Sequence, residues 1–557
     1  METTDVIVMG SGGAGLTAAV VAAQKGLRVL VAEKADCFGG TTALSGGGIW
    51  VPVSRAAVEA GFDDSKEKAA RYVENIVGPT LEKDQLAAFL DNAPRMVDYL
   101  EANTAVAFTL QPGFPDWEDA DGAVEDGRLL SPVEYDGKAL GDWFGKLRPP
   151  LSEFNAPGGF MIGLNDMPHL MNATKSFKSF VYMARLGARF AVDRLRYPRG
   201  TRLTMGNALM ARLLRSALDA GVELWDRAAV VDLLKDGNRI TGAVIERNGE
   251  RIEVTANRGV VLASGGFSAN PEMRAKFIPY PDQHVSLVPE TNTGDGLNMA
   301  MSAGGVMEEE NLCNGAWTLM SLATHPDGTV TKFPHLFLDR PKPGCIAVNS
   351  RGERFADEAA LDMVKDMHAS GSVPAHLVCD HKFIKKYGLG MVKPGGMGLK
   401  KWINQGYIVT APTLAELAGK IGVDAAGLEE SARRMTRYAS DGHDPDFGKG
   451  NPKDVGMGDP DHKPNPCLGP VETGPFYAVK VYPGDSTTTL GLRVDDRARV
   501  MDTAGQPLKG LYAAGLDMNS LWRGVPPGNG GNNTLSLTFG YIAALDMAQG
   551  EAHDKVA

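Results

Sequence analysis

The chain has 557 residues, 43% of them hydrophobic, and a formal net charge of -11. This length exceeds a single ordinary core and predicts two domains, with insertions between noncontiguous pieces. The acidic balance argues against a nucleic-acid partner and against a basic membrane-binding face. The five cysteines are dispersed without a CxxC pair, so neither a disulfide framework nor an iron–sulfur or zinc site is predicted.

The first residues carry neither a basic region nor an apolar region typical of a targeting segment. No apolar run of membrane-spanning length is found along the chain. We therefore predict no membrane insertion and expect a cytoplasmic protein.

Residues 5–19 read as a β-strand, a glycine turn and a small-residue helix. Gly10 permits the tight turn, Gly12 lets the backbone approach a pyrophosphate, and Gly15 lets helix and strand pack closely. A second predicted strand ends in Glu33, which at that spacing can accept hydrogen bonds from an adenosine ribose. The pattern predicts a dinucleotide site, NAD or FAD, against the alternative of a glycine turn without a ligand.

Residues 37–50 form a loop rich in glycine and hydroxyl groups, which exposes amides and small donors to a ligand unless it is a flexible linker. Helices are expected between about 64 and 103, followed by a less regular stretch from 104 to 200. Within it, Trp117 and Phe144 are either pocket-lining or core aromatics.

The next elements are a helix, strands and a small antiparallel sheet. They are expected at 207–220 (helix), 222–225, 229–234, 241–246 and 251–254. The run 259–267 then reads as a fully apolar strand that ends in Ser264-Gly265-Gly266, as expected of a buried parallel strand that meets a ligand at its carboxyl end. Asp295, before a predicted helix at 297–303, is either a helix cap or a ligand contact.

The sequence pattern of the segment from about 319 to 487 differs from that of the segments before and after it. The chain then returns with a buried strand that ends at Gly515 and with a final helix, 535–548, preceded by a glycine- and asparagine-rich loop. Free amides at that helix N-terminus suit an electron-rich group such as a flavin carbonyl.

Eight motifs occur here in the order found in one flavoprotein family. They are the first strand–turn–helix, Gly-Gly-Thr-Thr-Ala-Leu-Ser-Gly-Gly-Gly, Arg-Gly-Thr-Arg-Leu, Val-Leu-Ala-Ser-Gly-Gly-Phe, Asn-Thr-Gly-Asp-Gly, Gly-Glu-Arg-Phe, Leu-Tyr-Ala-Ala-Gly and Leu-Thr-Phe-Gly-Tyr. Over essentially its whole length the chain resembles the 3-ketosteroid Δ1-dehydrogenase branch of the fumarate reductase and succinate dehydrogenase flavoprotein superfamily. The resemblance implies an α/β fold, with a discontinuous Rossmann-like FAD-binding domain (1–318 and 488–557) and an inserted α+β substrate-capping, catalytic domain (319–487).

The resemblance also implies the residues that contact FAD. They are Gly10, Gly12, Gly15, Glu33, Gly39, Gly40, Thr41, Thr42, Ser45, Gly47, Val230, Ala263, Ser264, Gly265, Asp295, Gly515, Asp517 and Leu535. Because Thr41 and Thr42 stand where some relatives tether FAD through a histidine, noncovalent FAD is expected.

The implied chemistry is desaturation of a ketone: a proton leaves the α carbon and a hydride leaves the β carbon for flavin N5. The family's base, a tyrosine, corresponds here to Asp362. Its second tyrosine, which donates to the carbonyl, corresponds to Pro526, while the glycine that supplies a backbone amide survives as Gly530. A third pocket aromatic corresponds to Trp117.

Asp362 can serve as the base if burial raises its pKa; otherwise Asp362, Lys365 and Asp366 lie on a solvated helix. Candidates to replace the lost tyrosine donor are Tyr197, Tyr482, Asn529 and Arg523. Arg523 is either a cation for a substrate carboxylate or a structural residue. The predicted catalytic residues are therefore Asp362, Gly530, Tyr197, Arg523 and Trp117, with no metal.

The predicted function is an FAD-dependent dehydrogenase that introduces an α,β (Δ1-type) double bond into a cyclic ketone, either a 3-ketosteroid or a smaller cyclohexanone-type ring. Trp117 and the lost tyrosine favour the smaller ring. The electron acceptor is unidentified. One alternative is a soluble fumarate-reductase-like enoate reductase, although the arginine expected within 359–362 is absent. Another is a flavin-binding electron-transfer subunit.

Overall fold

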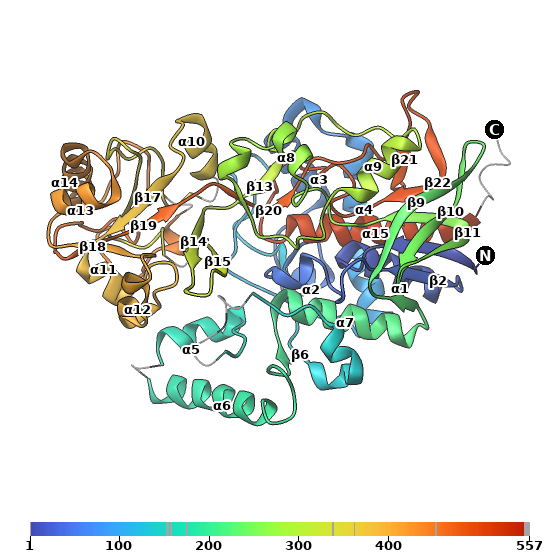
Figure 1. Cartoon of the computed structure of the whole chain (residues 1–557), viewed down its shortest axis with the longest axis horizontal. Coiled ribbons are helices and arrows are strands. Elements are labelled where there is room, and N and C mark those ends of the chain that lie inside the picture. The colour runs from blue at the N-terminus through green and yellow to red at the C-terminus, as the bar shows by residue number, and fades with distance from the viewer. Residues whose placement is uncertain are drawn as a thin grey trace. The chain divides into compact units, whose positions relative to one another are not determined.

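The computed structural model is a mixed α/β protein and describes residues 2–151, 155, 159–173, 176–336, 339–360, 363–451 and 454–550 (Figure 1). It divides into two compact units. Unit 1 comprises Met1–Asn270, Pro289–Asn314 and Thr488–Ala557, and unit 2 comprises Pro271–Val288 and Gly315–Thr487. Among the described residues, no helix is both long and apolar enough to span a membrane.

Besides residues 315–318, which also belong to unit 2, the unit boundaries differ from the predicted division in the segment 271–288, which the resemblance places in the first domain. In the structure this segment belongs to unit 2, because strand β12 (Val285–Ser286) pairs in parallel with β20 (Gly484–Thr488). Arg274 also forms an ion pair with the fully buried Asp485, at 2.9 Å. Both contacts join residues that are about two hundred positions apart in the chain.

Unit 1 is built on a sheet with the strand order β21-β22-β10-β11-β1-β2-β8, and β9 pairs with β10. Its strands are β1 (Glu2–Met9), β2 (Val29–Ala32), β8 (Glu223–Trp225), β9 (Ala228–Asp236), β10 (Arg239–Arg247), β11 (Glu250–Leu262), β21 (Arg499–Met501) and β22 (Pro507–Ala513). Strand β1 runs parallel to both of its neighbours, β11 and β2. The last four residues of each of these three strands are apolar and buried, as expected when helices cover both faces of a parallel sheet.

Two buried helices, α1 (Gly13–Gln24) and α15 (Gly531–Gln549), pack closely in unit 1. A Cβ atom at Gly540 would lie 2.5 Å from the carbonyl oxygen of Ala14, so glycine permits the close approach. The other regular elements of unit 1 are β3 (Ile49–Trp50), α2 (Arg55–Glu59), α3 (Lys66–Val77), α4 (Lys83–Asn103), β4 (Phe108–Leu110), β5 (Leu129–Pro132), β6 (Tyr135–Asp136), α5 (Met167–Met171), α6 (Phe177–Asp193), β7 (Arg202–Leu203), α7 (Met205–Asp219) and α9 (Asp295–Ser302).

Three elements differ from the sequence prediction. The strands expected at 251–254 and 259–267 form one strand, β11, which ends at Leu262, and the last helix begins at Gly531 rather than at Leu535. The stretch described as irregular contains α6, a helix of 17 residues. Flanking prolines and glycines set the expectation there, although the residues inside α6 have good helix propensity.

Unit 2 contains an antiparallel sheet with the order β16-β17-β19-β18. One core cluster includes Met363, Phe383 and Trp402, and another includes Leu428 and Met435. The elements are α8 (Pro271–Phe277), β13 (Gly315–Trp317), β14 (Met320–Thr324), β15 (Val330–Pro334), β16 (Cys345–Val348), α10 (Met363–Ala369), β17 (Ala375–Cys379), α11 (His381–Lys386), α12 (Leu399–Asn404), β18 (Val409–Ala411), α13 (Leu414–Ile421), α14 (Ala425–Asp441) and β19 (Phe476–Val481).

Candidate cofactor and active site

A cleft of about 750 Å³, including its opening to solvent, lies in unit 1 where β1, β2 and β11 end. Twelve of the predicted cofactor contacts line it: Gly10, Gly12, Glu33, Gly40, Thr41, Thr42, Val230, Ala263, Ser264, Gly265, Asp295 and Gly515. The carboxyl end of a parallel sheet is where dinucleotides bind in such folds.

The turn after β1 requires glycine for reasons of backbone geometry. Gly10 has φ +98°, and a Cβ atom there would lie 2.4 Å from the carbonyl oxygen of Ala263. A Cβ atom at Gly15 would lie 2.0 Å from the carbonyl oxygen of Gly10. Gly15 therefore sets the approach of α1 to β1 and does not itself line the cleft.

Glu33 connects the end of β2 to the glycine turn. One carboxylate oxygen accepts hydrogen bonds from the Ser11 amide at 3.0 Å and the Ser11 hydroxyl at 2.5 Å. The other accepts a hydrogen bond from the Ala35 amide at 2.8 Å. The carboxylate thus lines the cleft in a fixed orientation.

Asp295 is the first residue of α9, and the helix cap position belongs to Gly294. Its carboxylate forms an ion pair with Lys34 at 2.8 Å, and both residues line the cleft. The sequence predicts Asp295 to be either a helix cap or a ligand contact, and this geometry favours the ligand contact.

Other predicted contacts shape the loops around the cleft. Asp517 is fully buried, and its carboxylate accepts hydrogen bonds from the amides of Ser264, at 2.5 Å, and Gly266, at 3.0 Å. Burial raises the pKa of Asp517. A Cβ atom at Gly47 would lie 2.4 Å from the Gly206 nitrogen, and the Ser45 hydroxyl donates to the Thr42 carbonyl at 2.8 Å. The Gly39 amide donates to the Ser11 hydroxyl at 3.1 Å.

A smaller neighbouring cavity of about 240 Å³ is lined by Leu535 and shares Gly515, Leu516 and Ser536 with the cleft. Thr488 and Ser520 also line it, and their hydroxyl oxygens are buried without a hydrogen-bond partner in the described part of the chain.

The lining fits FAD. In the cleft, Nε of Arg148 is likewise buried without a described partner. A dinucleotide offers this guanidinium an anionic diphosphate, and a flavin ring offers carbonyl and N–H groups to the orphaned hydroxyls of the smaller cavity.

Sequence reasoning missed several lining residues: Ser11, Gly13, Ala14, Lys34, Arg148, Ala228, Thr291, Asn292, Leu516 and Ser536. Lys34 could have been found, since it directly follows Glu33. Arg148 carried no local signal, because it lies in the stretch interpreted as irregular.

Two of the predicted catalytic residues lie at the loop 526–530: Gly530 ends it, and the Trp117 segment contacts it. The Trp117 amide donates to the Pro527 carbonyl at 3.2 Å, and the Tyr72 hydroxyl donates to the same oxygen at 2.7 Å. Gly530 is the N-cap of α15 with φ +87°, and a Cβ atom there would lie 2.3 Å from the Gly48 carbonyl oxygen. Glycine is therefore required at 530 whatever its role in chemistry.

A buried ion cluster fixes the Trp117 segment, and sequence reasoning missed it. Arg128 is 1% exposed and forms ion pairs of 2.6 Å with both Asp64 and Asp116. Asp116 also accepts a hydrogen bond from the Trp50 indole at 2.7 Å. Burial raises the pKa of Asp116, although Arg128 acts in the opposite direction.

Tyr197 and Arg523, two further predicted catalytic residues, contact parts of unit 1 other than the loop 526–530. The ring of Tyr197 packs edge-on against Phe144, with centroids 5.9 Å apart. The Arg523 guanidinium donates to the Thr80 carbonyl at 3.0 Å and forms ion pairs of 3.3 Å with Glu82 and Glu308. Because two carboxylates already contact this cation, the contacts favour the structural alternative for Arg523.

Asp362 lies outside the described residues, but the residues that precede it are held firmly. The Ala359 amide donates to the Asp357 carboxylate at 2.7 Å. Arg354 donates to both carboxylate oxygens of Glu358 at 2.8 Å, and Arg340 donates to the Glu358 carbonyl at 2.7 Å. The backbone as far as Ala360 is thus held by hydrogen bonds to its amide and carbonyl groups.

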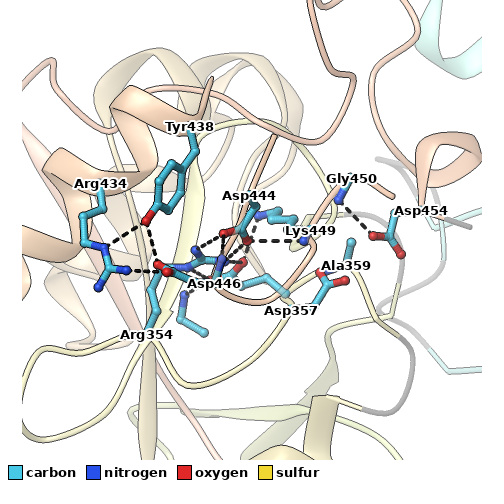
Figure 2. Close-up of polar contacts among 12 residues, drawn as sticks. Arg354, Asp357, Ala359, Arg434, Tyr438, Asp444, Asp446, Lys449, Gly450 and Asp454 are labelled. Atoms are coloured by element: carbon cyan, nitrogen blue, oxygen red, sulfur yellow. Dashed lines mark hydrogen bonds and ion pairs between the residues drawn. The ribbon is translucent and has the colours of Figure 1, made fainter. Parts of the chain in front are cut away.

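Figure 2 shows much of the surrounding network. We call the following residues the ionic cluster: Arg354, Asp357, Glu358, Asp444, Lys449 and Asp454. Arg354 also pairs with Asp444 at 2.9 Å, and Lys449 with Glu358 at 3.4 Å. All six residues are at least nine-tenths buried.

The cluster separates the pKa values of two adjacent carboxyl groups. Burial alone would raise the pKa of Glu358, but Arg354 and Lys449 lower it to about 2. Burial, followed by the neighbouring carboxylates of Asp454 and Glu358, raises the pKa of Asp357 to about 7. Asp357 and Asp454 are hydrogen-bonded and share a proton, since two adjacent buried carboxylates disfavour double ionisation.

The fold and the cleft define a flavoprotein class. The model of the FAD binding domain family matches residues 5–533, and the chain belongs to this family. It is an FAD-dependent dehydrogenase that acts on CH–CH groups.

Two relatives and one solved structure resemble nearly the whole chain. A 4-oxocyclohex-2-ene-1-carboxylate 5-dehydrogenase from Sinomonas cyclohexanicum is 38% identical over 98% of this chain and 94% of its own length. A 3-oxosteroid 1-dehydrogenase from Mycolicibacterium smegmatis is 33% identical over 98% and 97%. The crystal structure of a 3-ketosteroid Δ1-dehydrogenase from Sterolibacterium denitrificans, in complex with 1,4-androstadiene-3,17-dione, has 35% identity and a TM-score of 0.92, covering 99% of this chain and all of that one.

Proposed function

We propose that this chain desaturates a small cyclohexanone-type ring beside its carbonyl group, and that the ring carries a carboxylate. The observation that carries the proposal is the 38% identity, over 98% of the chain, to the 4-oxocyclohex-2-ene-1-carboxylate 5-dehydrogenase. Pro526 and Trp117 support a small ring, because they replace the tyrosines of the steroid enzymes that the chain resembles. The proposal includes the Rossmann-like, discontinuous FAD-binding domain and the inserted capping domain.

FAD, when bound, supplies the acceptor for the hydride that leaves the β carbon. In the proposal, Asp362 removes the α proton and the Gly530 amide donates to the ketone oxygen, where charge develops. The fixed segments around Gly530 and before Asp362 support this, since both groups require exact placement. Trp117 borders the ring.

Anaerobic mixing of the FAD-loaded protein with candidate substrates tests the proposed reaction. We expect 4-oxocyclohexanecarboxylate or 4-oxocyclohex-2-ene-1-carboxylate to bleach the flavin absorbance faster than a 3-ketosteroid at equal concentration. Faster bleaching by the steroid would contradict the small-ring assignment. Bleaching by succinate alone would contradict ketone desaturation and favour the enoate reductase.

The variant Asp362→Asn tests the base. We expect flavin reduction by the ketone to slow by at least about 100-fold, because a general base typically contributes 10²–10⁴-fold, while FAD stays bound. The matched control is Asp366→Asn, the same chemical change at an exposed position of α10, which we expect to leave the rate of flavin reduction normal. A near-normal rate in Asp362→Asn would move the base elsewhere, and Tyr197→Phe and Tyr482→Phe would be tested next.

A further inference from the structure

Helix α6 of unit 1 is labelled in Figure 1, and the side chains on its inner face contact neighbouring segments. The Tyr182 hydroxyl donates to Asp166 at 2.6 Å, and its ring stacks on His169 with centroids 4.3 Å apart. Buried Asp193 accepts hydrogen bonds from the Thr201 amide and hydroxyl and pairs with Lys138 at 3.1 Å. The orientation of the helix is therefore fixed.

The opposite face of the same helix is also apolar, and it is exposed. The exposed fractions are 82% for Phe177, 57% for Phe180, 64% for Val192 and 82% for Leu195, which lies in the turn after the helix. At about 100° per residue these side chains, with the exposed Ala184, Ala188 and Ala191, lie within about 60° of one line along the helix. The stripe is about 27 Å long at 1.5 Å per residue.

Basic side chains flank this stripe. Residues 176–199 contain six basic residues and one acidic residue, the buried Asp193. Lys178, Arg185, Arg194 and Arg196 are exposed, whereas Arg189 pairs with Glu134 and Asp136. The net charge of -11 for the whole chain conceals this local excess of positive charge.

We propose that the outer face of α6 docks on an anionic lipid bilayer, with the helix lying in the plane of the interface. A helix that is apolar on an exposed face normally buries that face, and a flanking row of Lys and Arg is typical of interfacial helices. The described part of the chain contains no helix that could cross a membrane, and α6 is itself too charged to do so. The contact is thus peripheral and independent of the substrate assignment.

Charge distinguishes a lipid surface from a second copy of this chain. Two copies paired through this face would bring two rows of arginine and lysine side chains together without compensating carboxylates. Anionic headgroups neutralise these cations while the acyl region covers the phenylalanine and leucine side chains. A bilayer therefore matches both features of the face.

Cosedimentation of the FAD-loaded protein with vesicles tests the proposal. We expect binding to vesicles of equal parts phosphatidylglycerol and phosphatidylcholine, at least about tenfold weaker binding to phosphatidylcholine alone, and release at high salt. The triple variant Phe177→Ser, Phe180→Ser, Leu195→Ser and the double variant Arg185→Glu, Arg196→Glu should each lose at least about tenfold in affinity.

The matched control, Leu312→Ser with Val330→Ser, removes two exposed apolar side chains at other sites and should bind vesicles like the parent. Flavin content should be unchanged in every variant, because only exposed side chains change. Three results would overturn the proposal: no vesicle binding by the parent, equal binding of the parent and both α6 variants, or lipid-free self-association that the serine substitutions abolish.

Discussion

The cofactor cleft of unit 1 and the ionic cluster of unit 2 are both fixed structures, but they are built by different means. The cleft depends on backbone approach: Gly10 and Gly15 admit neighbouring carbonyl groups that no side chain would tolerate. The cluster depends on charges that come from distant parts of the chain, such as Arg354 and Asp444. Substitutions that add side-chain volume should therefore disrupt the cleft, whereas changes that alter the charge of a side chain should disrupt the ionic cluster.

The largest effect that we predict concerns the glycines that shape the cofactor cleft. In Gly15→Ala the added Cβ atom would lie 2.0 Å from a backbone carbonyl oxygen, so helix α1 cannot keep its position. We expect loss of folded, FAD-loaded protein, measured as flavin absorbance per chain after purification.

Two glycine variants in unit 1 serve as controls. At Gly12 a Cβ atom meets no protein atom within 4 Å, but Gly12 lines the cleft, so Gly12→Ala should fold and bind FAD more weakly. Exposed Gly145 also has open space, and Gly145→Ala should behave as the parent. Normal FAD content in Gly15→Ala would refute the packing argument.

The second largest effect that we predict concerns the ionic cluster. Glu358→Gln keeps the shape of the side chain but leaves buried Arg354 and Lys449 without one of their anionic partners. Breaking a buried ion pair costs about 3–5 kcal/mol, so the midpoint of denaturant unfolding should fall clearly.

The control for this variant lies five residues earlier in the chain. Glu353 pairs with Arg351 at 2.7 Å, but the two side chains are 54% and 70% exposed. Glu353→Gln should change the unfolding free energy by less than about 1 kcal/mol. Equal effects of the two substitutions would show that burial does not determine the strength of these pairs.

The same contrast explains what the sequence could predict. The glycine turn, Glu33 and the Thr41-Thr42 loop were found because their spacing in the chain reflects one local geometry, and all of them line the cleft. Arg148 was missed because the chain that carries it has no periodic pattern. The partners of Arg523 are Glu82 and Glu308, two positions that no local motif connects to it.

Helix α6 shows a second kind of limit. Its residues combine an apolar stripe with flanking basic side chains, which is also the pattern of an ordinary surface helix, and the sequence does not show that the stripe is exposed. The net charge of the whole chain gives no indication of this helix either, because acidic residues elsewhere outweigh the six basic residues of this segment.

The smallest effect that we predict is the contribution of Asp357, in the ionic cluster, to the pH dependence of stability. Asp357 has its pKa raised to about 7, against 3.8 for an ordinary aspartate. Between these two values the folded chain keeps a proton that the unfolded chain has lost, so unfolding releases a proton. The contribution of Asp357 to the free energy of unfolding is therefore greatest below pH 4. It falls as the pH rises from about 4 to 7 and is constant above pH 7.

Asp357→Asn should remove most of this slope. The asparagine oxygen can still accept the hydrogen bond from the Ala359 amide, and its amide group can donate to Asp454 without a shared proton. Between pH 5 and pH 8 the parent should lose on the order of 1–3 kcal/mol more unfolding free energy than the variant. Asp454→Asn should have a similar effect, because it removes the other member of the pair. Hydrogen exchange at the Ala359 amide would locate the change, and a slope in Asp357→Asn as steep as that of the parent would assign the titration to another group.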